Sequence, residues 1–214
     1  QDPGRYQPGM EAFFLEQLAV KASIGLTSVW AREQLRRLAT RDPLTGLRNR
    51  RDLDETMSQE LSRARRYNLP LSILFIDCDD FKQVNDTYGH ASGDQFLQTF
   101  AKRLKTLPWK NTIIMRIAGD EFGVFIGGLE TLDEAFKKKI WKTMKDKVIK
   151  PIEIKKHTLP LSISLGMAVY NEDTTNIHAL IDYADFAMYQ AKRVKEQGSH
   201  YHSFNPEEYK NKET

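Results

Sequence analysis

The residues best suited to chemistry are acids placed where predicted strands end. Asp77 follows an apolar run and precedes Asp79 and Asp80, while Asp120 and Glu121 occupy the tip of a predicted hairpin. If the two strands are neighbours in one sheet, these carboxylates converge and repel one another unless a cation neutralises them. Hard oxygen ligands suit Mg²⁺ or Mn²⁺, completed by water and substrate phosphates. The pattern predicts metal-assisted phosphoryl or nucleotidyl transfer.

Acids also collect in solvated turns, and that explanation suffices for Asp79 or Asp80 taken alone. Asp77 and Asp120 differ, because each is joined directly to an apolar strand. For this pair, metal binding is the better interpretation.

The segment 81–94 has the composition of a nucleotide-binding stretch. Lys82 supplies a point charge for phosphate oxygens. Asn85 and Asp94 supply the donor and acceptor groups that a purine edge requires, and a carboxylate pairs with the two N–H donors of guanine but not with adenine. His90 is ambiguous, since a lone histidine is more often a structural hydrogen-bonding residue than a ligand.

Hydrophobic periodicity places these residues on a regular succession of elements. Helices are expected over 52–67, 93–107, 132–148 and 177–194, and strands over 71–76, 112–117, 122–126, 161–169 and 201–204. The order from residue 71 is β-α-β-β-α-β followed by a helix. It predicts an α+β fold of the ferredoxin-like or palm-like type, an antiparallel sheet with helices on one face.

The chain before this domain differs in pattern. Residues 1–10 are rich in proline and glycine and are expected to form a loop, whereas 11–40 lack proline and repeat apolar residues at steps of three and four. We expect a linker helix with coiled-coil spacing that connects and dimerises, although a surface helix folded onto the next domain fits comparably well. The expected domains are 1–40 and 41–214.

Composition narrows the class of protein. Among 214 residues, 32 Lys and Arg face 29 Asp and Glu, an excess too small and dispersed for a nucleic-acid surface. No apolar run approaches the roughly 18 residues of a membrane span. Cys78 is the only cysteine, which excludes an internal disulfide and is consistent with the cytoplasm. A start at Gln1, with no signal-peptide pattern, indicates part of a longer protein.

Three strings carry a resemblance to a known family. DPLTGLRNRR at 42–51, DCDDFKQVNDTYGH at 77–90 and RIAGDEF at 116–122 resemble the signatures of the GGDEF family of diguanylate cyclases, in the family's order. The resemblance implies condensation of two GTP molecules into cyclic di-GMP with release of two pyrophosphates. It also implies a homodimer, since each domain holds one GTP. The upstream helix resembles the end of a GAF-type sensory domain.

The resemblance assigns roles to the acids. It implies that Asp77 and Asp120 ligate Mg²⁺ through their side chains and Cys78 through its backbone carbonyl, with Glu121 assisting. It names Asp120 as the base for the ribose 3′-hydroxyl, although a carboxylate already bound to metal is a weak base.

The resemblance also assigns the GTP contacts. Lys82 would stabilise the phosphates in the transition state, with backbone amides near Phe81 cradling them. Asn85 and Asp94 would bind guanine, with His90 nearby, and Lys192 would add a further phosphate contact.

This sequence departs from the family pattern at three places. Ala118 replaces the first glycine of the signature, which costs about 1–2 kcal/mol only if that position needs a positive φ. The product-inhibition motif Arg-x-x-Asp aligns with Trp109 to Thr112, so we expect no tight feedback binding there. Residues 197–200 lack the usual phosphate-binding arginine, so we expect that this contact is either lost or replaced by Arg193 or Lys195.

Two rival functions remain. A degenerate domain that binds GTP without turnover would explain Ala118 and the missing arginine. A cyclase acting on an adenine nucleotide is opposed by Asp94.

Overall fold

The chain divides into two compact units between Thr40 and Arg41. A computed structural model describes residues 10–67, 69–128, 132–194 and 198–211, so the loop expected at 1–10 lies almost wholly outside the described residues. The first unit holds α1 (Met10–Thr40), one uninterrupted helix whose large apolar side chains from Phe13 to Leu38 are exposed.

Within α1, the stretch Ala12–Thr40 is long and apolar enough to cross a membrane. This finding qualifies the expectation that the segment holds no span. Length and composition are criteria that a signal sequence or a helix of a soluble protein also meets, and the cytoplasmic location stays a prediction.

The second unit is an α+β domain built on a six-stranded sheet, in the order β1-β3-β4-β2-β7-β8. Its strands are β1 (Arg48–Asn49), β2 (Leu71–Cys78), β3 (Thr112–Ala118), β4 (Glu121–Gly127), β7 (Ile163–Val169) and β8 (His200–Ser203), with a separate hairpin of β5 (Ile152–Ile154) and β6 (His157–Leu159). Its helices are α2 (Leu53–Tyr67), α3 (Phe81–Tyr88), α4 (His90–Leu104), α5 (Glu134–Lys147), α6 (Ile177–Lys192) and α7 (Pro206–Lys210), with a 3₁₀ turn at Arg50–Asp52.

The palm-like fold is confirmed, with a mixed rather than a purely antiparallel sheet. The four central strands β3, β4, β2 and β7 are antiparallel, as expected. The edge strands β1 and β8 run parallel to β3 and β7. The β5–β6 hairpin, β1 and α7 were not expected, because strands of two or three residues and a helix of five carry too few side chains to show a period.

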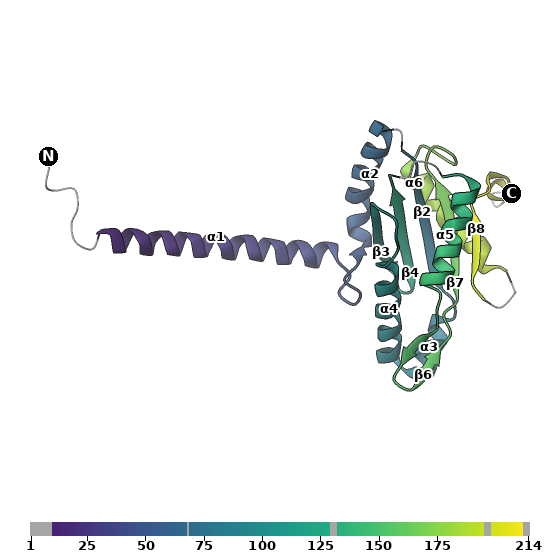
Figure 1. Ribbon diagram of the computed structural model, residues 1–214, viewed down its shortest axis with the longest axis horizontal. Helices are drawn as coiled ribbons and strands as arrows, with labels where there is room; N and C mark the ends of the chain where they lie inside the picture. The colour runs from purple at the N-terminus through teal and green to yellow at the C-terminus, as the bar shows by residue number, and fades with distance from the viewer. Residues whose placement is uncertain (1–9, 68, 129–131, 195–197, 212–214) are drawn as a thin grey trace. The chain divides into compact units, whose positions relative to one another are not determined.

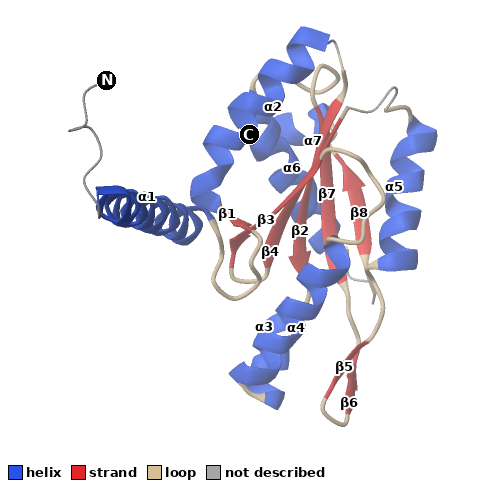
Figure 2. Ribbon diagram, turned by 60° about the vertical axis from the view of Figure 1, so that its left-hand side comes forward, coloured by secondary structure: helices blue, strands red, loops and turns tan. Residues whose placement is uncertain are grey.

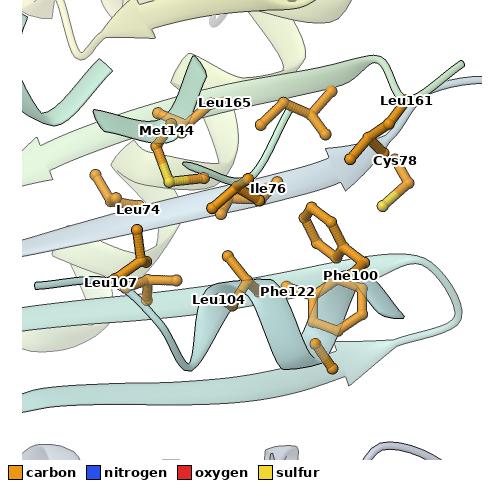
Figure 3. Close-up of a cluster of buried hydrophobic side chains, with 14 of the residues drawn as sticks. Leu74, Ile76, Cys78, Phe100, Leu104, Leu107, Phe122, Met144, Leu161 and Leu165 are labelled. Atoms are coloured by element: carbon orange, nitrogen blue, oxygen red, sulfur yellow. The ribbon is translucent and has the colours of Figure 1, made fainter. Parts of the chain in front are cut away.

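Helices cover both faces of the sheet, which corrects the expectation of one covered face (Figures 1 and 2). Residues of α4 and α5 pack with Leu74 and Ile76 on one face (Figure 3). Residues of α2 and α6 pack with Ile73 and Phe75 on the other. The cause is visible in β2, all of whose residues are buried; a strand covered on both sides is apolar on successive positions rather than alternate ones.

A glycine in β7 lets α6 approach the sheet closely. A β carbon at Gly166 would lie 2.0 Å from the backbone nitrogen of Met188 and 2.2 Å from the carbonyl oxygen of Ala184. The helix backbone therefore packs directly on β7, and this contact fixes where the C-terminal end of α6 lies.

We predict that Gly166→Ala lowers the free energy of unfolding by about 1–3 kcal/mol, because α6 must shift to admit the methyl group. Gly127→Ala in β4 is the matched control, since its new β carbon meets the nearest atom at 3.4 Å; it should stay within about 0.5 kcal/mol of the parent protein. Urea titration of both variants measures the difference, and equal stabilities would contradict the close packing.

Candidate functional site

The acidic site is built where β2 ends beside the start of β4. Asp77 pairs in register with Glu121, and both lie on the sheet face that α6 covers. Asp77 is only 5% exposed. The backbone N–H of Cys78 donates to the carbonyl of Asp120 at 3.2 Å, which ties the β3–β4 turn to the end of β2. The expected neighbourhood of the two strands is therefore confirmed.

The carboxylates at this strand end feel one another's charge. Burial and the nearby Asp77 raise the pKa of Asp120. Burial raises the pKa of Glu121 as well, with further contributions from Asp77, Asp185 and Asp120. Asp185 belongs to α6 and was missed by the sequence analysis, since no spacing rule links a helix residue to a distant turn. The site carries an excess of negative charge.

One ammonium group balances part of this charge. The Nζ of Lys192, in the last turn of α6, donates to Oδ1 of Asp77 at 2.8 Å. Burial alone would lower the pKa of Lys192, but the hydrogen bond and the charge of Asp77 raise it above its usual value. A cation thus already sits on the most buried carboxylate.

The donor set fits a hard divalent cation that also takes oxygens from its substrate. Among the described residues, no three His, Cys, Asp or Glu side chains are grouped to hold a metal by themselves. Asp77 and Asp120 are nevertheless mutually repelling carboxylates, and Lys192 stands where a cation is needed. The sulfur of Cys78 lies in the core of the opposite face (Figure 3), so only its backbone carbonyl is left as a donor.

The turn that carries Asp120 is linked through Arg116 to Asp42, near the first residue of the domain. The Nε of Arg116 donates to the carbonyl of Gly119 at 2.8 Å, and its Nη1 donates to both carboxylate oxygens of Asp42 at 3.1 Å. Burial opposes ionisation of Asp42, but hydrogen bonds from Thr45 and Arg116 hold its pKa below the usual value. Two of the sequence motifs therefore meet at one ion pair.

The turn geometry also locates the substituted signature residue. Gly119 has a φ of +41°, whereas Ala118 is the last residue of β3 and is not among the positions of positive φ. The glycine that the backbone requires is retained. The methyl group of Ala118 lies on an exposed residue.

Asp79 fastens the loop between β2 and α3 to β7. Its Oδ2 accepts from the hydroxyl of Ser162 at 2.8 Å and its Oδ1 from that of Ser164 at 2.7 Å. Its backbone N–H donates to the carbonyl of Ser162. The sequence alone predicts a solvated acid at this position, because both serine partners lie more than eighty residues away along the chain.

The expected nucleotide-binding residues lie on α3 and α4. Lys82 is exposed in the first turn of α3, and His90 and Asp94 are exposed in the first turns of α4. The side chain of Asn85 packs against Gly93. A β carbon at residue 93 would lie only 2.0 Å from the Oδ1 of Asn85, so glycine at this position leaves room for the Asn85 side chain.

Two departures from the family pattern fall at defined places. Trp109 packs against the core, and the Thr112 hydroxyl donates to the Trp109 carbonyl at 2.7 Å. Both side chains are uncharged, so neither replaces the arginine or the aspartate of the product-inhibition motif. The absence of tight feedback stays a prediction. Lys195 lies outside the described residues, and Arg193 is exposed after α6.

A family model described as "Diguanylate cyclase, GGDEF domain" matches residues 39–198. The chain is 37% identical over 181 residues to the bifunctional diguanylate cyclase/cyclic di-GMP phosphodiesterase MucR of Pseudomonas aeruginosa, covering 82% of this chain and 25% of MucR. It is 35% identical over 161 residues to diguanylate cyclase DgcP of Escherichia coli, covering 73% of this chain and 45% of DgcP. The chain thus spans a quarter to about half of these relatives.

Among solved structures, the GGDEF domain of TpbB from Pseudomonas aeruginosa superposes with a TM-score of 0.72 at 33% identity. The match covers 81% of this chain and 99% of the TpbB chain.

We predict that Asp120→Asn raises the melting temperature of the metal-free protein by about 1–3 °C at pH 7.5. A carboxyl group whose pKa is raised on folding contributes stability below its unfolded pKa and loses it as pH rises through the folded pKa. Removing the charge of Asp120 therefore stabilises the folded protein at pH 7.5 and has little effect on its stability below pH 4. Thermal melts in EDTA at both pH values check this, and a lower melting temperature at pH 7.5 would contradict the repulsion.

Proposed function

Because the chain belongs to the GGDEF family of diguanylate cyclases, we propose that it condenses two GTP molecules into cyclic di-GMP and two pyrophosphates. The observation that carries the proposal is the convergence of Asp77, Asp120 and Glu121 at one strand end, with Lys192 as their counter-charge. In this proposal the active form is a homodimer of this domain, because each domain holds one of the two GTP molecules.

In this proposal Asp77, Asp120 and the carbonyl of Cys78 hold Mg²⁺ or Mn²⁺, and Glu121 assists. The bound cation supplies neutralisation of phosphate charge and a lowered pKa for the ribose 3′-hydroxyl. The carboxylates of Asp77 and Asp120 would hold the cation at the end of β2, and the hydrogen bond from Arg116 to Gly119 braces the turn that carries Asp120.

The substrate contacts follow from the positions of the polar groups. The first amides of α3, near Phe81, have no carbonyl partner within the helix and are suited to phosphate oxygens. Lys82 and Lys192 add positive charge there. Asn85 and Asp94 bind the guanine edge, with His90 beside them, and the close packing of Asn85 on Gly93 orients the amide.

The proton of the attacking 3′-hydroxyl passes to Asp120. A carboxylate that holds a metal ion is a weak base, so the transfer depends on the lowered pKa that the cation would give the hydroxyl group. The 3′-oxygen then forms a bond to the α-phosphorus of the partner's GTP, and pyrophosphate leaves. One domain holds one GTP, so two copies must face each other for both bonds to form.

The rival role, GTP binding without turnover, draws on Ala118 and on the missing arginine, and the ordinary backbone at Ala118 removes the first of these two supports.

Incubation with GTP and Mg²⁺, followed by chromatography, tests the function. We expect cyclic di-GMP formation to rise more than linearly with protein concentration, and Asp77→Asn to lower it about 100-fold or more through loss of a metal ligand. Asp146→Asn, an exposed acid of α5, is the control and should keep full activity. Bound GTP with no product at high protein concentration would establish the non-catalytic role, and a product formed only from ATP would refute guanine recognition by Asp94.

We predict that Ala118→Gly changes the turnover number by less than about tenfold, a barrier change of about 1.4 kcal/mol. The reason is that Ala118 ends a strand with ordinary φ, so the backbone of the turn does not depend on its side chain. Gly119→Ala is the matched contrast, because its φ of +41° disfavours a β carbon, and it should lose more activity. Steady-state assays of both variants decide, and the reverse ranking would contradict the assignment.

A further inference from the structure

Lys192 is the cation on which the acidic site relies when no metal is present. Its ammonium group contacts Asp77, whose side chain is only 7% exposed, while the lysine side chain itself is 49% exposed. The charges of Asp120 and Asp79 also act on it. The close packing of α6 on Gly166 delivers the lysine to this place.

A divalent ion and this ammonium group cannot both keep their best positions. A buried carboxylate without a counter-charge is costly, so Asp77 needs a cation at all times. When a divalent ion binds Asp77, it repels the ammonium group across a few ångströms. A half-exposed side chain on a flexible stem is able to leave, and the phosphates of an incoming nucleotide offer it a new partner.

We propose that Lys192 is an exchangeable internal counter-cation, which neutralises Asp77 in the empty site and transfers to substrate phosphate when the metal–GTP complex binds. The proposal deepens the cyclase function and rests on it. Its consequence is an order of loading: the bare divalent ion competes with Lys192 and binds weakly, whereas the ion arriving with GTP brings the phosphate that accepts the displaced ammonium group.

A lysine that serves only to bind phosphate has a different consequence. Its removal would weaken GTP binding and leave the affinity for a bare metal ion unchanged. Exchange instead predicts opposite effects on the two ligands, because the same side chain competes with one and assists the other.

The test measures Mn²⁺ binding to nucleotide-free protein by electron paramagnetic resonance. Lys192→Met keeps the apolar stem and removes the charge, and it should bind Mn²⁺ about fivefold or more tightly than the parent protein. Lys192→Arg keeps the charge and should resemble the parent, as should the control Lys138→Met on the exposed face of α5. In EDTA, Lys192→Met should melt at a lower temperature than the parent, and Mn²⁺ should raise its melting temperature more.

Unchanged, weaker or undetectable Mn²⁺ binding by Lys192→Met would overturn the exchange. This readout does not depend on turnover. If the parent protein makes cyclic di-GMP while Lys192→Met shows no gain in Mn²⁺ affinity, the exchange fails and the cyclase function stands. If Lys192→Met gains affinity and the parent protein makes no cyclic di-GMP, competition at the empty site is supported and the cyclase function fails.

Discussion

The electrostatics of the site follow from one constraint, a carboxylate at the end of a strand that is buried on both faces. All eight residues of β2 are buried, and the four residues Ile73 to Ile76 before Asp77 are all apolar. A charge in that position requires a neighbouring cation. Successive side chains of a strand point to opposite faces of the sheet. Asp77 therefore faces α6 together with Glu121, whereas the Cys78 side chain points into the core on the other face. The atom of Cys78 that is left to bind a metal ion is therefore its carbonyl oxygen and not its sulfur.

Packing and charge are linked through α6. The helix approaches the sheet at Gly166 because no side chain separates the two backbones. Its last turn then carries Lys192 to Asp77, and Asp185 contributes charge to the same strand end. A substitution at Gly166, which pairs with Phe75 two residues before Asp77, is therefore expected to alter the position of the counter-charge. Stability of the helix layer and the chemistry of the acids depend on one contact.

The sequence predicted the central sheet well and its surroundings poorly. The order of strands places β2 beside β4, so convergence of Asp77 and Glu121 could be foreseen. The helix cover on both faces could have been suspected from the four successive apolar residues Ile73 to Ile76 of β2. The role of Asp79 could not, because both serines that bond it come from β7 and its approach, and only the register of the folded sheet brings them together. The roles of the nucleotide-binding residues stay predictions.

In the turn between β3 and β4, the backbone conformation requires glycine at residue 119 but not at residue 118. Gly119 holds the unusual φ, and its carbonyl is clamped by Arg116, which Asp42 in turn orients with two hydrogen bonds. The side chain at 118 takes part in none of these contacts, so an alanine there changes the surface of the turn and not its course. Asp42 is the second residue after α1. The turn that carries Asp120 is thus braced by the first residues of the domain through the ion pair of Arg116 with Asp42.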